Sequence, residues 1–255
     1  MLALVALLLA STPCPQGEPL EGGQHTRLST ERGAIHLWCD AETELRAVVI
    51  YVHGYGDDVD SAFTNHQLAA QFAKSNVEAL FISVAAPSGP EGQVAFEELD
   101  SLLAQVSKHV GAPLPETVVL LGHSGGYRTL KLWLSSTRVQ EVVLLDGFYG
   151  DSAPWSQWLI NRPSATLRLI GLETWDKAEA WRVGLPETVR GRVNHTPAKC
   201  PHMEIITQGE WLPRVLRESS SLSPRGEKEP FEGGADQPLS TTIGTSLAWR
   251  ITVEN

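Results

Sequence analysis

Short apolar runs alternate with amphipathic segments along most of the chain. Continuous β-branched and aromatic runs suit strands covered on both faces, whereas apolar residues at helical spacing predict amphipathic helices. The predicted strands are 34–38, 46–52, 77–84, 117–122, 139–145, 166–172 and 192–195. The predicted helices are 67–73, 92–110, 127–134, 152–160, 178–183 and 210–217. Because strands and helices alternate, we expect an α/β fold with a mostly parallel central sheet and helices on both of its faces.

The two ends of the chain depart from this alternation. Met1–Ala10 is an uninterrupted apolar run, too short for the roughly 20 residues of a membrane span. It matches the apolar region of a secretory signal, so 1–16 is predicted as a signal peptide and 17–32 as a linker; a buried N-terminal strand or helix is the alternative. A single domain is predicted at 33–217. Residues 218–255 open with a Ser-, Pro- and Gly-rich stretch, and this tail is predicted to be disordered or to dock as an edge strand.

Charge narrows the choice of partner. The formal net charge is -10 and the sequence pI is near 5.3. Nucleic acid and anionic lipid both favour a basic face, so neither is expected as a partner. We expect an exported protein, periplasmic or secreted, that binds a small-molecule or acyl substrate and has no integral membrane span. Its oligomeric state stays open.

The chain has three cysteines, whose state depends on whether the protein is exported. Cys14 lies where bacterial lipoproteins carry their lipid, but Pro13 departs from the lipoprotein pattern, so lipid anchoring is the less favoured alternative. If cleavage falls beyond Cys14, the remaining pair is Cys39 and Cys200, which an exported protein could join in a disulfide. Two unrelated thiols are the alternative.

Candidate chemistry begins with Gly122-His123-Ser124-Gly125-Gly126, which matches the pattern G-x-S-x-G. The motif lies between a predicted buried strand and a predicted helix, which is the context that a nucleophilic serine of this kind requires. The sharp turn lifts the hydroxyl above the sheet and points helical N–H groups at a developing oxyanion. Ser124 is therefore the predicted nucleophile; an incidental serine in a Gly-rich turn is the alternative.

A second motif, His53-Gly54-Tyr55-Gly56, directly follows the strand predicted at 46–52. Acyl transfer needs two N–H donors for the oxyanion, one from the residue after the nucleophile and one from a loop such as this. The predicted donors are the amides of Gly125 and Tyr55. An ordinary turn is the alternative for this motif.

Together, VVIYVHGYG and VVLLGHSGG resemble the α/β-hydrolase superfamily, over about residues 33–217. The resemblance implies a serine hydrolase of the esterase type, with a catalytic triad in the chain order Ser, acid, His. A lid is expected to be short or absent, because only a modest stretch separates the later strands. The superfamily also contains acyltransferases and members without activity, so the fold alone does not name a reaction.

The catalytic base must then come late in the chain. His195 and His202 are the two histidines that follow Ser124. His202 follows the last predicted strand, in the loop where the family keeps its histidine, and is the predicted base. His195 lies in or at the end of that strand and is the alternative.

The acid has two candidates. Asp146 ends the strand predicted at 139–145, and a buried carboxylate at a strand end needs a partner such as an imidazole. Asp176 follows the strand predicted at 166–172, the commoner position in the family, with Glu173 beside it, but it could equally cap the following helix. We favour Asp146 and keep Asp176 as the alternative acid.

Other polar and aromatic groups are given weaker roles. Trp155 and Trp158 lie on one face of a predicted helix after Asp146 and are predicted to line an apolar acyl pocket, with core packing as the alternative. Asp57, Asp58 and Asp60 crowd the loop after His53-Gly54-Tyr55-Gly56, but their spacing matches no metal motif, so a solvated helix-capping loop is expected. We expect no metal and no cofactor.

The predicted function is cleavage of an ester, thioester or amide through an acyl-enzyme. The alternatives are acyl transfer to an acceptor other than water, or a non-catalytic hydrolase-like binding domain. The acyl and leaving groups of the substrate are not predicted.

Overall fold

The computed structural model describes residues 12–41 and 43–222. Within them, one nine-stranded sheet has the order β1-β2-β3-β5-β4-β6-β7-β8-β9. The strands are β1 Glu18–Leu20, β2 Gly23–Thr30, β3 Gly33–Cys39, β4 Ala47–Val52, β5 Ala79–Val84, β6 Val118–His123, β7 Val139–Leu145, β8 Thr166–Gly171 and β9 Val193–Pro197. From β4 to β9 every neighbouring pair is parallel, whereas β1, β2 and β3 extend the sheet in antiparallel pairs.

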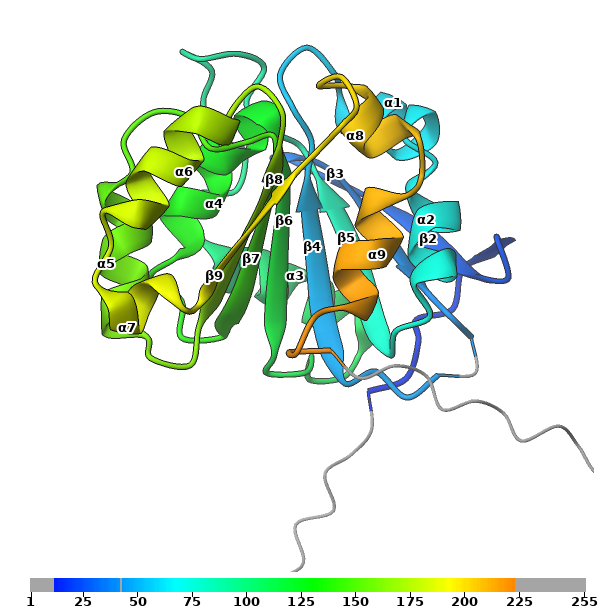
Figure 1. Ribbon diagram of the computed structural model, residues 1–255. Coiled ribbons are helices and arrows are strands. Elements are labelled where there is room, and N and C mark those ends of the chain that lie inside the picture. Colours follow the sequence, from blue (N-terminus) through cyan, green and yellow to red (C-terminus); the bar gives the residue numbers. More distant parts are fainter. Residues whose placement is uncertain (1–11, 42, 223–255) are drawn as a thin grey trace, which may run out of the picture. The chain divides into compact units, whose positions relative to one another are not determined.

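Helices cover both faces of the sheet, as predicted (Figure 1). They are α1 Val59–Asn65, α2 Leu68–Ser75, α3 Leu99–Val110, α4 Tyr127–Trp133, α5 Ala153–Asn161, α6 Trp175–Val183, α7 Glu187–Arg190, α8 Glu204–Thr207 and α9 Trp211–Arg217. One core cluster packs α3 to α7 against one face of the sheet, and a second packs α1, α2, α8 and α9 against the other. Alternate residues of β4 enter the two clusters, because successive side chains of a strand point to opposite faces.

The parallel strands define where a site can form. Ligands of open α/β sheets bind beyond the carboxyl ends of the strands. The loops that follow β4, β6, β7, β8 and β9 carry the residues singled out by sequence. Between β7 and β8 the chain forms α5 and short loops, in agreement with the expected short or absent lid.

The N-terminal part of the fold corrects the predicted boundaries. Residues 17–32 are not a linker: they form β1 and β2, which pair with each other and attach to β3. The folded part already includes Thr12, whose hydroxyl donates a hydrogen bond of 2.6 Å to the carbonyl of Pro113. A signal peptide that extended to residue 16 would remove this contact. The predicted apolar run Met1–Ala10 lies outside the described residues.

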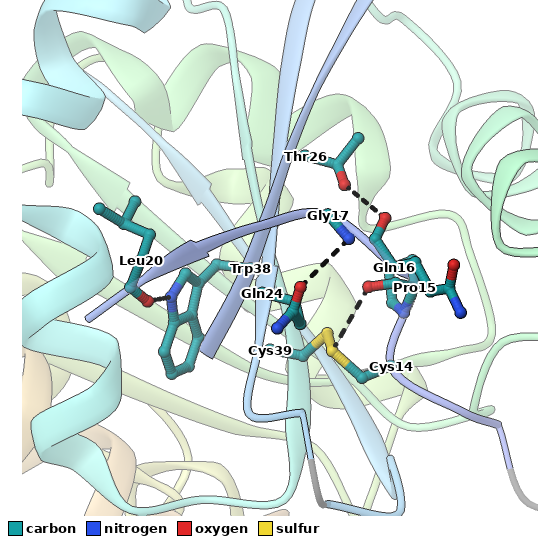
Figure 2. Close-up of a disulfide and its surroundings, with 9 residues drawn as sticks. All are labelled: Cys14, Pro15, Gln16, Gly17, Leu20, Gln24, Thr26, Trp38 and Cys39. Carbon is teal, nitrogen blue, oxygen red and sulfur yellow. Dashed lines mark hydrogen bonds between the residues drawn. A yellow bond between two sulfur atoms is a disulfide. The ribbon is translucent and has the colours of Figure 1, made fainter. Parts of the chain in front are cut away.

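A disulfide joins this N-terminal segment to the sheet. Cys14 is bonded to Cys39 at the end of β3, and Cys200 is a buried free thiol. Of the two alternatives left open for Cys39 and Cys200, the disulfide between them is therefore excluded, and a Cys14 sulfur bonded to Cys39 cannot carry a lipid. Figure 2 shows the hydrogen bonds around this disulfide, among them that of the Trp38 indole N–H to the carbonyl of Leu20, 2.8 Å long. The Trp38 bond ties β1 to β3, and the Thr26 and Gln24 side chains of β2 bond Gln16 and Gly17, just before β1.

Several helix boundaries also differ from the prediction. The helix expected at 92–110 begins only at Leu99: residues 92–98 are not helical, and the backbone of Glu98, which caps the helix, is extended. Phe96 is buried nonetheless, and its carbonyl accepts the indole N–H of Trp133. Helices α1, α7 and α8 are short and were not predicted. Of the predicted tail 218–255, the first residues belong to the fold: the Ser219 hydroxyl donates to Glu141 at 2.6 Å, and Leu222 joins the second core cluster. The rest of the tail, beyond residue 222, lies outside the described residues.

The aspartates after β4 behave as expected of a helix-capping loop. The Asp58 carboxylate accepts the Ser61 backbone N–H at 2.9 Å and so caps α1. Asp60 instead pairs with Arg27 of β2 and with His36 of β3. Among the described residues, no helix is long and apolar enough to cross a membrane.

Candidate active site

Ser124 lies on the turn that the motif predicted. Strand β6 ends at His123, a single 3₁₀ turn spans Ser124–Gly126, and α4 follows. The Ser124 φ is 47°, in the left-handed region that non-glycine residues rarely adopt and that clusters at functional sites. The turn fits because residue 126 is glycine: a Cβ there would lie 2.5 Å from the carbonyl oxygen of Val52. This sharp turn places Ser124, half-buried, at the carboxyl end of the parallel strands.

The loop after β4 lies against this turn. The Tyr55 ring packs on Gly125 so closely that a Cβ at Gly125 would lie 2.3 Å from the ring. His53 holds the loop in place, since its Nδ1 donates to the carbonyl of Gly54 at 2.7 Å and its Nε2 accepts the backbone N–H of Ala86 at 3.0 Å. Burial lowers the pKa of His53, which keeps the ring neutral and suited to both bonds. The two predicted oxyanion donors, Tyr55 and Gly125, are thus neighbours.

His202 and Asp146 are brought together from loops that follow β9 and β7. The Nδ1 of His202 lies 2.9 Å from Oδ2 of Asp146. The hydrogen bond to Asp146 raises the pKa of His202, against the opposing effect of burial. An imidazole whose Nδ1–H is held by a carboxylate presents Nε2 as a base.

Asp146 is almost fully buried, with 1% of its surface exposed, and is held by several donors. Its Oδ1 accepts the backbone N–H and the hydroxyl of Thr174, at 2.9 and 3.0 Å. Its Oδ2 also accepts the Glu173 backbone N–H, at 3.4 Å. Although burial alone would raise the pKa of Asp146, the bonds to His202 and Thr174 lower it to about 2. This buried carboxylate is therefore ionised at neutral pH.

The alternative acid lies elsewhere. Asp176 is exposed in the first turn of α6, and Thr174 rather than Asp176 is the N-terminal cap of that helix. Sequence reasoning missed Thr174, whose N–H and hydroxyl fix Asp146. The one available indication was its position just after β8, at the sheet edge where Asp146 was expected. Gly171 contributes by its size, because a Cβ there would lie 2.6 Å from Oδ1 of Asp146.

His123 links the nucleophile turn to the His202 loop. Its ring centroid lies 4.7 Å from that of His202, and its Nε2 donates to the His202 backbone carbonyl at 3.1 Å. Burial, together with the charge of His202, lowers the pKa of His123 to about 4. A neutral His123, adjacent to Ser124 in the chain, therefore holds the His202 loop beside this turn.

One further carboxylate approaches this pair. An oxygen of Glu173 lies 3.8 Å from Nδ1 of His202. Asp146, Glu173 and His202 thus present ligand-type atoms within 4.8 Å of one another. We assign no metal to them, because the Nδ1 proton already accounts for the approach of Asp146 and His202.

Trp155 and Trp158 differ from their predicted role. Both are buried in the core cluster beneath α5, with 0% and 3% of their surfaces exposed. Rings so covered present almost no surface, so their burial fits the core-packing role that was the alternative. The periodicity of a helix face is the same in both cases, which is why sequence could not separate them.

Comparison with known proteins identifies the fold. The structure matches an S-formylglutathione hydrolase from Agrobacterium tumefaciens with a TM-score of 0.52 at 13% identity, over 78% of this chain and 98% of that one. It matches an S-formylglutathione hydrolase from Staphylococcus aureus with a TM-score of 0.54 at 11% identity, over 79% and 97%. An enterochelin esterase from Shigella flexneri gives 0.53 at 15% identity, over 80% of this chain and 59% of that one. No protein-family model and no curated protein sequence matches the chain.

Proposed function

We propose that this chain, which has the α/β-hydrolase fold that its two motifs predicted, is a serine hydrolase that cleaves an ester, thioester or amide. Ser124 is the nucleophile, His202 the general base and Asp146 the acid that orients it. The backbone N–H groups of Tyr55 and Gly125 bind the oxyanion. No cofactor is needed for this chemistry.

One observation carries the proposal: the His202 imidazole, held by the buried, ionised Asp146 carboxylate, lies next to the strained turn that bears Ser124. The His202–Asp146 hydrogen bond is 2.9 Å, and the ring of His123, the residue before Ser124, packs on His202. The structural neighbours that are described as hydrolases and esterases share the fold and so support the same reaction class. They share too little sequence to indicate a substrate.

In the acylation half, Oγ of Ser124 attacks the substrate carbonyl carbon while its proton passes to Nε2 of His202. The carbonyl oxygen becomes an oxyanion, which the Tyr55 and Gly125 amides stabilise. The bond to the leaving group then breaks, and the leaving group takes the proton from His202. The product of this half is an acyl ester on Ser124.

In the deacylation half, His202 accepts a proton from water as the water oxygen attacks the acyl carbon. The second tetrahedral intermediate collapses with release of the carboxylic acid, and Ser124 recovers its proton from His202. Asp146 stays ionised throughout and stabilises the imidazolium that forms twice in the cycle.

The test is labelling with a fluorophosphonate probe, followed by mass mapping of the modified residue. We expect one modified serine, Ser124, and loss of labelling in Ser124→Ala. Hydrolysis of activated esters should fall by several orders of magnitude in the same variant, since the whole machinery acts through that oxygen. The matched control is Ser135→Ala, an exposed serine just beyond the carboxyl end of α4, which should label normally.

An undiminished label in Ser124→Ala would falsify the assignment. A wild-type protein that never labels would favour the non-catalytic binding domain. Labelling together with ester products in the presence of an added alcohol, in place of free acid, would favour acyl transfer.

We also propose that the protein is exported. The Cys14–Cys39 disulfide supports this, because disulfides persist in oxidising compartments. Cleavage that preserves both Thr12 and Cys14 would leave the folded part intact. N-terminal sequencing of protein from its native host checks this: we expect a start shortly after Ala10, and an intact Met1 in a cytoplasmic fraction would contradict it.

A further inference from the structure

A second carboxylate flanks His202 on the side where Asp146 holds it. Glu173 comes from the loop between β8 and α6, and its Oε2 lies 3.8 Å from Nδ1 of His202. Asp146 comes from the neighbouring strand, β7, and lies 2.9 Å from the same nitrogen. We propose that Glu173 is a positioning residue for His202: a second acid that stabilises the imidazolium and sustains residual activity when Asp146 is lost. This inference rests on the proposed serine hydrolase function.

Both carboxylate oxygens of Asp146 already accept hydrogen bonds. Its Oδ1 is occupied by two donors of Thr174, and its Oδ2 is shared between His202 and the Glu173 backbone N–H. Glu173 therefore contributes in two ways. Its backbone N–H bonds to Asp146, and its side chain lies near the His202 imidazole. A residue of the loop after β8 that only held Asp146 would need the backbone bond to Asp146 but not the side-chain approach to His202.

The separation of 3.8 Å determines how Glu173 acts. It is too long for a hydrogen bond, so Asp146 accepts the Nδ1 proton and Glu173 contributes charge. An opposite charge within about 4–6 Å favours the protonated imidazole. The pKa of His202 is raised mainly by Asp146, with Glu173 acting in the same direction. Because 57% of the Glu173 side chain is exposed, solvent weakens its effect relative to that of buried Asp146.

A tyrosine directs the Glu173 side chain toward His202. The Tyr149 hydroxyl donates to Oε2 of Glu173 at 3.5 Å. The loop that carries Tyr149 is fixed in turn, because Lys131 donates to the Tyr149 carbonyl at 3.3 Å and Lys177 donates to the Gly150 carbonyl at 2.6 Å. Burial, together with the charges of Asp146 and Glu173, raises the pKa of Tyr149 to about 12, so the hydroxyl keeps its proton.

Among the described residues, the further titratable group in contact with His202 is His123 of β6. Burial holds its pKa near 4, so it stays neutral where His202 titrates. The charge balance around the imidazole is therefore set by the two carboxylates. Losing either one should move the titration of His202 in the same direction, by different amounts.

The first test reads His202 directly and needs no turnover. In the Ser124→Ala background, the imidazole C2–H of His202 is titrated by NMR with and without Glu173→Gln. We expect Glu173→Gln to lower the pKa of His202 by about half a unit, the scale expected of a partly exposed charge at this distance. The matched control is Asp176→Asn, which removes an equal charge from the same segment at a residue with no contact to His202; it should leave the titration unchanged. Equal shifts in the two variants would overturn the proposal.

The second test asks whether Glu173 replaces Asp146. Asp146→Gly suits the φ of 46° at this position and clears the space that Glu173 needs to approach Nδ1. We expect Glu173→Gln to lower kcat less than fivefold in the intact enzyme, and at least tenfold in the Asp146→Gly background. Equal factors in both backgrounds would overturn the back-up role. Tyr149→Phe should reproduce a smaller part of the Glu173→Gln effect on the His202 pKa.

The two proposals fail in different ways. If no variant, including the wild type, hydrolyses or labels, the serine hydrolase assignment fails. The NMR titration still decides whether Glu173 acts on His202. If the enzyme is active but Glu173→Gln behaves like Asp176→Asn in both tests, only the role of Glu173 fails.

Discussion

Two histidines follow Ser124 in the chain, and both lie within hydrogen-bond distance of a carboxylate. His202 Nδ1 is 2.9 Å from Asp146, and His195 Nδ1 is 2.7 Å from Glu179. By distance alone, the His195–Glu179 pair would be the stronger hydrogen bond. Yet the pKa of His202 is raised, whereas that of His195 is lowered.

The surroundings of each carboxylate explain the difference. Asp146 is buried, is held by backbone and hydroxyl donors, and has one cationic partner in His202. Glu179 has 35% of its side chain exposed and also binds Arg182 through two bonds of 2.8 Å. Its charge is thus shared and screened, and burial dominates the pKa of His195. A short His–carboxylate distance therefore does not identify a catalytic base.

The neighbours of the two rings sharpen the contrast. His202 packs on His123, the residue before Ser124, at the carboxyl end of the parallel strands. His195 stacks on Trp175 at 3.7 Å between ring centroids, within β9 and against α6. The first ring lies at the candidate site, and the second packs a helix against the edge of the sheet.

The largest expected effect separates these two histidines. His202→Gln should lower kcat/KM for an activated ester by about 10⁴- to 10⁶-fold, because the base is removed from every proton transfer. His195→Gln, the same replacement in the other pair, should change it less than threefold. Steady-state kinetics with both variants measure this. Comparable losses in the two would mean that His195 shares the chemistry.

Replacing the carboxylate partners of the two histidines, Asp146 and Glu179, should change kcat almost as differently. Asp146→Asn should lower kcat by about 10³- to 10⁴-fold. The Thr174 donors will hold the amide oxygen of the substituted side chain, which turns its N–H₂ group toward Nδ1 of His202 and favours the wrong tautomer. Glu179→Gln should leave kcat within threefold of the wild type.

The same kinetics with Asp176→Asn test the alternative acid. This exposed residue should give wild-type kcat, whereas a loss as large as that of Asp146→Asn would return the role to Asp176.

Sequence could predict the strands and the sharp turn of the candidate site because their constraints are local. Buried β-branched runs placed β4 and β6, and the glycines after β6 required a sharp turn at Ser124. Chain order and a position after the last strand were enough to prefer His202 over His195. The strands and the turn need only residues that are close in sequence, whereas the preference for His202 also used the resemblance to the α/β-hydrolases.

What sequence missed depends on partners distant in the chain. β1 and β2 are mostly polar; β1 pairs with β2, β2 pairs with β3, and the Cys14–Cys39 disulfide joins the segment before β1 to the end of β3. The donors that hold Asp146 come from Thr174, on another loop. The helix face of Trp155 and Trp158 looks alike whether it meets a substrate or the core. In each case the structure depends on a tertiary contact between residues far apart in the chain, which the hydrophobic periodicity of the sequence does not show.

The pH dependence offers a finer comparison. His202 must be neutral to act as a base, so kcat/KM should rise with pH through its pKa. Because Asp146 raises that pKa, the midpoint should lie above the ordinary value of 6.5. The C2–H of His195 should instead titrate below 6.5 in the same protein, since burial lowers its pKa.

A pH–rate profile and an NMR titration check these two midpoints. Residual activity of Asp146→Asn should show a lower midpoint than the wild type. A wild-type kinetic midpoint below 6.5 would contradict the assignment of His202 as the base.

The smallest expected effect concerns what His195 does instead of catalysis. Its stack on Trp175 is the kind of contact that contributes about 0.5–1.5 kcal/mol beyond simple burial. A double-mutant cycle with Trp175→Leu and His195→Gln, measured by urea unfolding, should therefore give a coupling free energy in that range. The same cycle with His202→Gln in place of His195→Gln should give none, because His202 packs on His123 rather than on Trp175. Coupling of Trp175 to His202 alone would mean that α6 supports the candidate site, and the contrast between the two histidines would have to be abandoned.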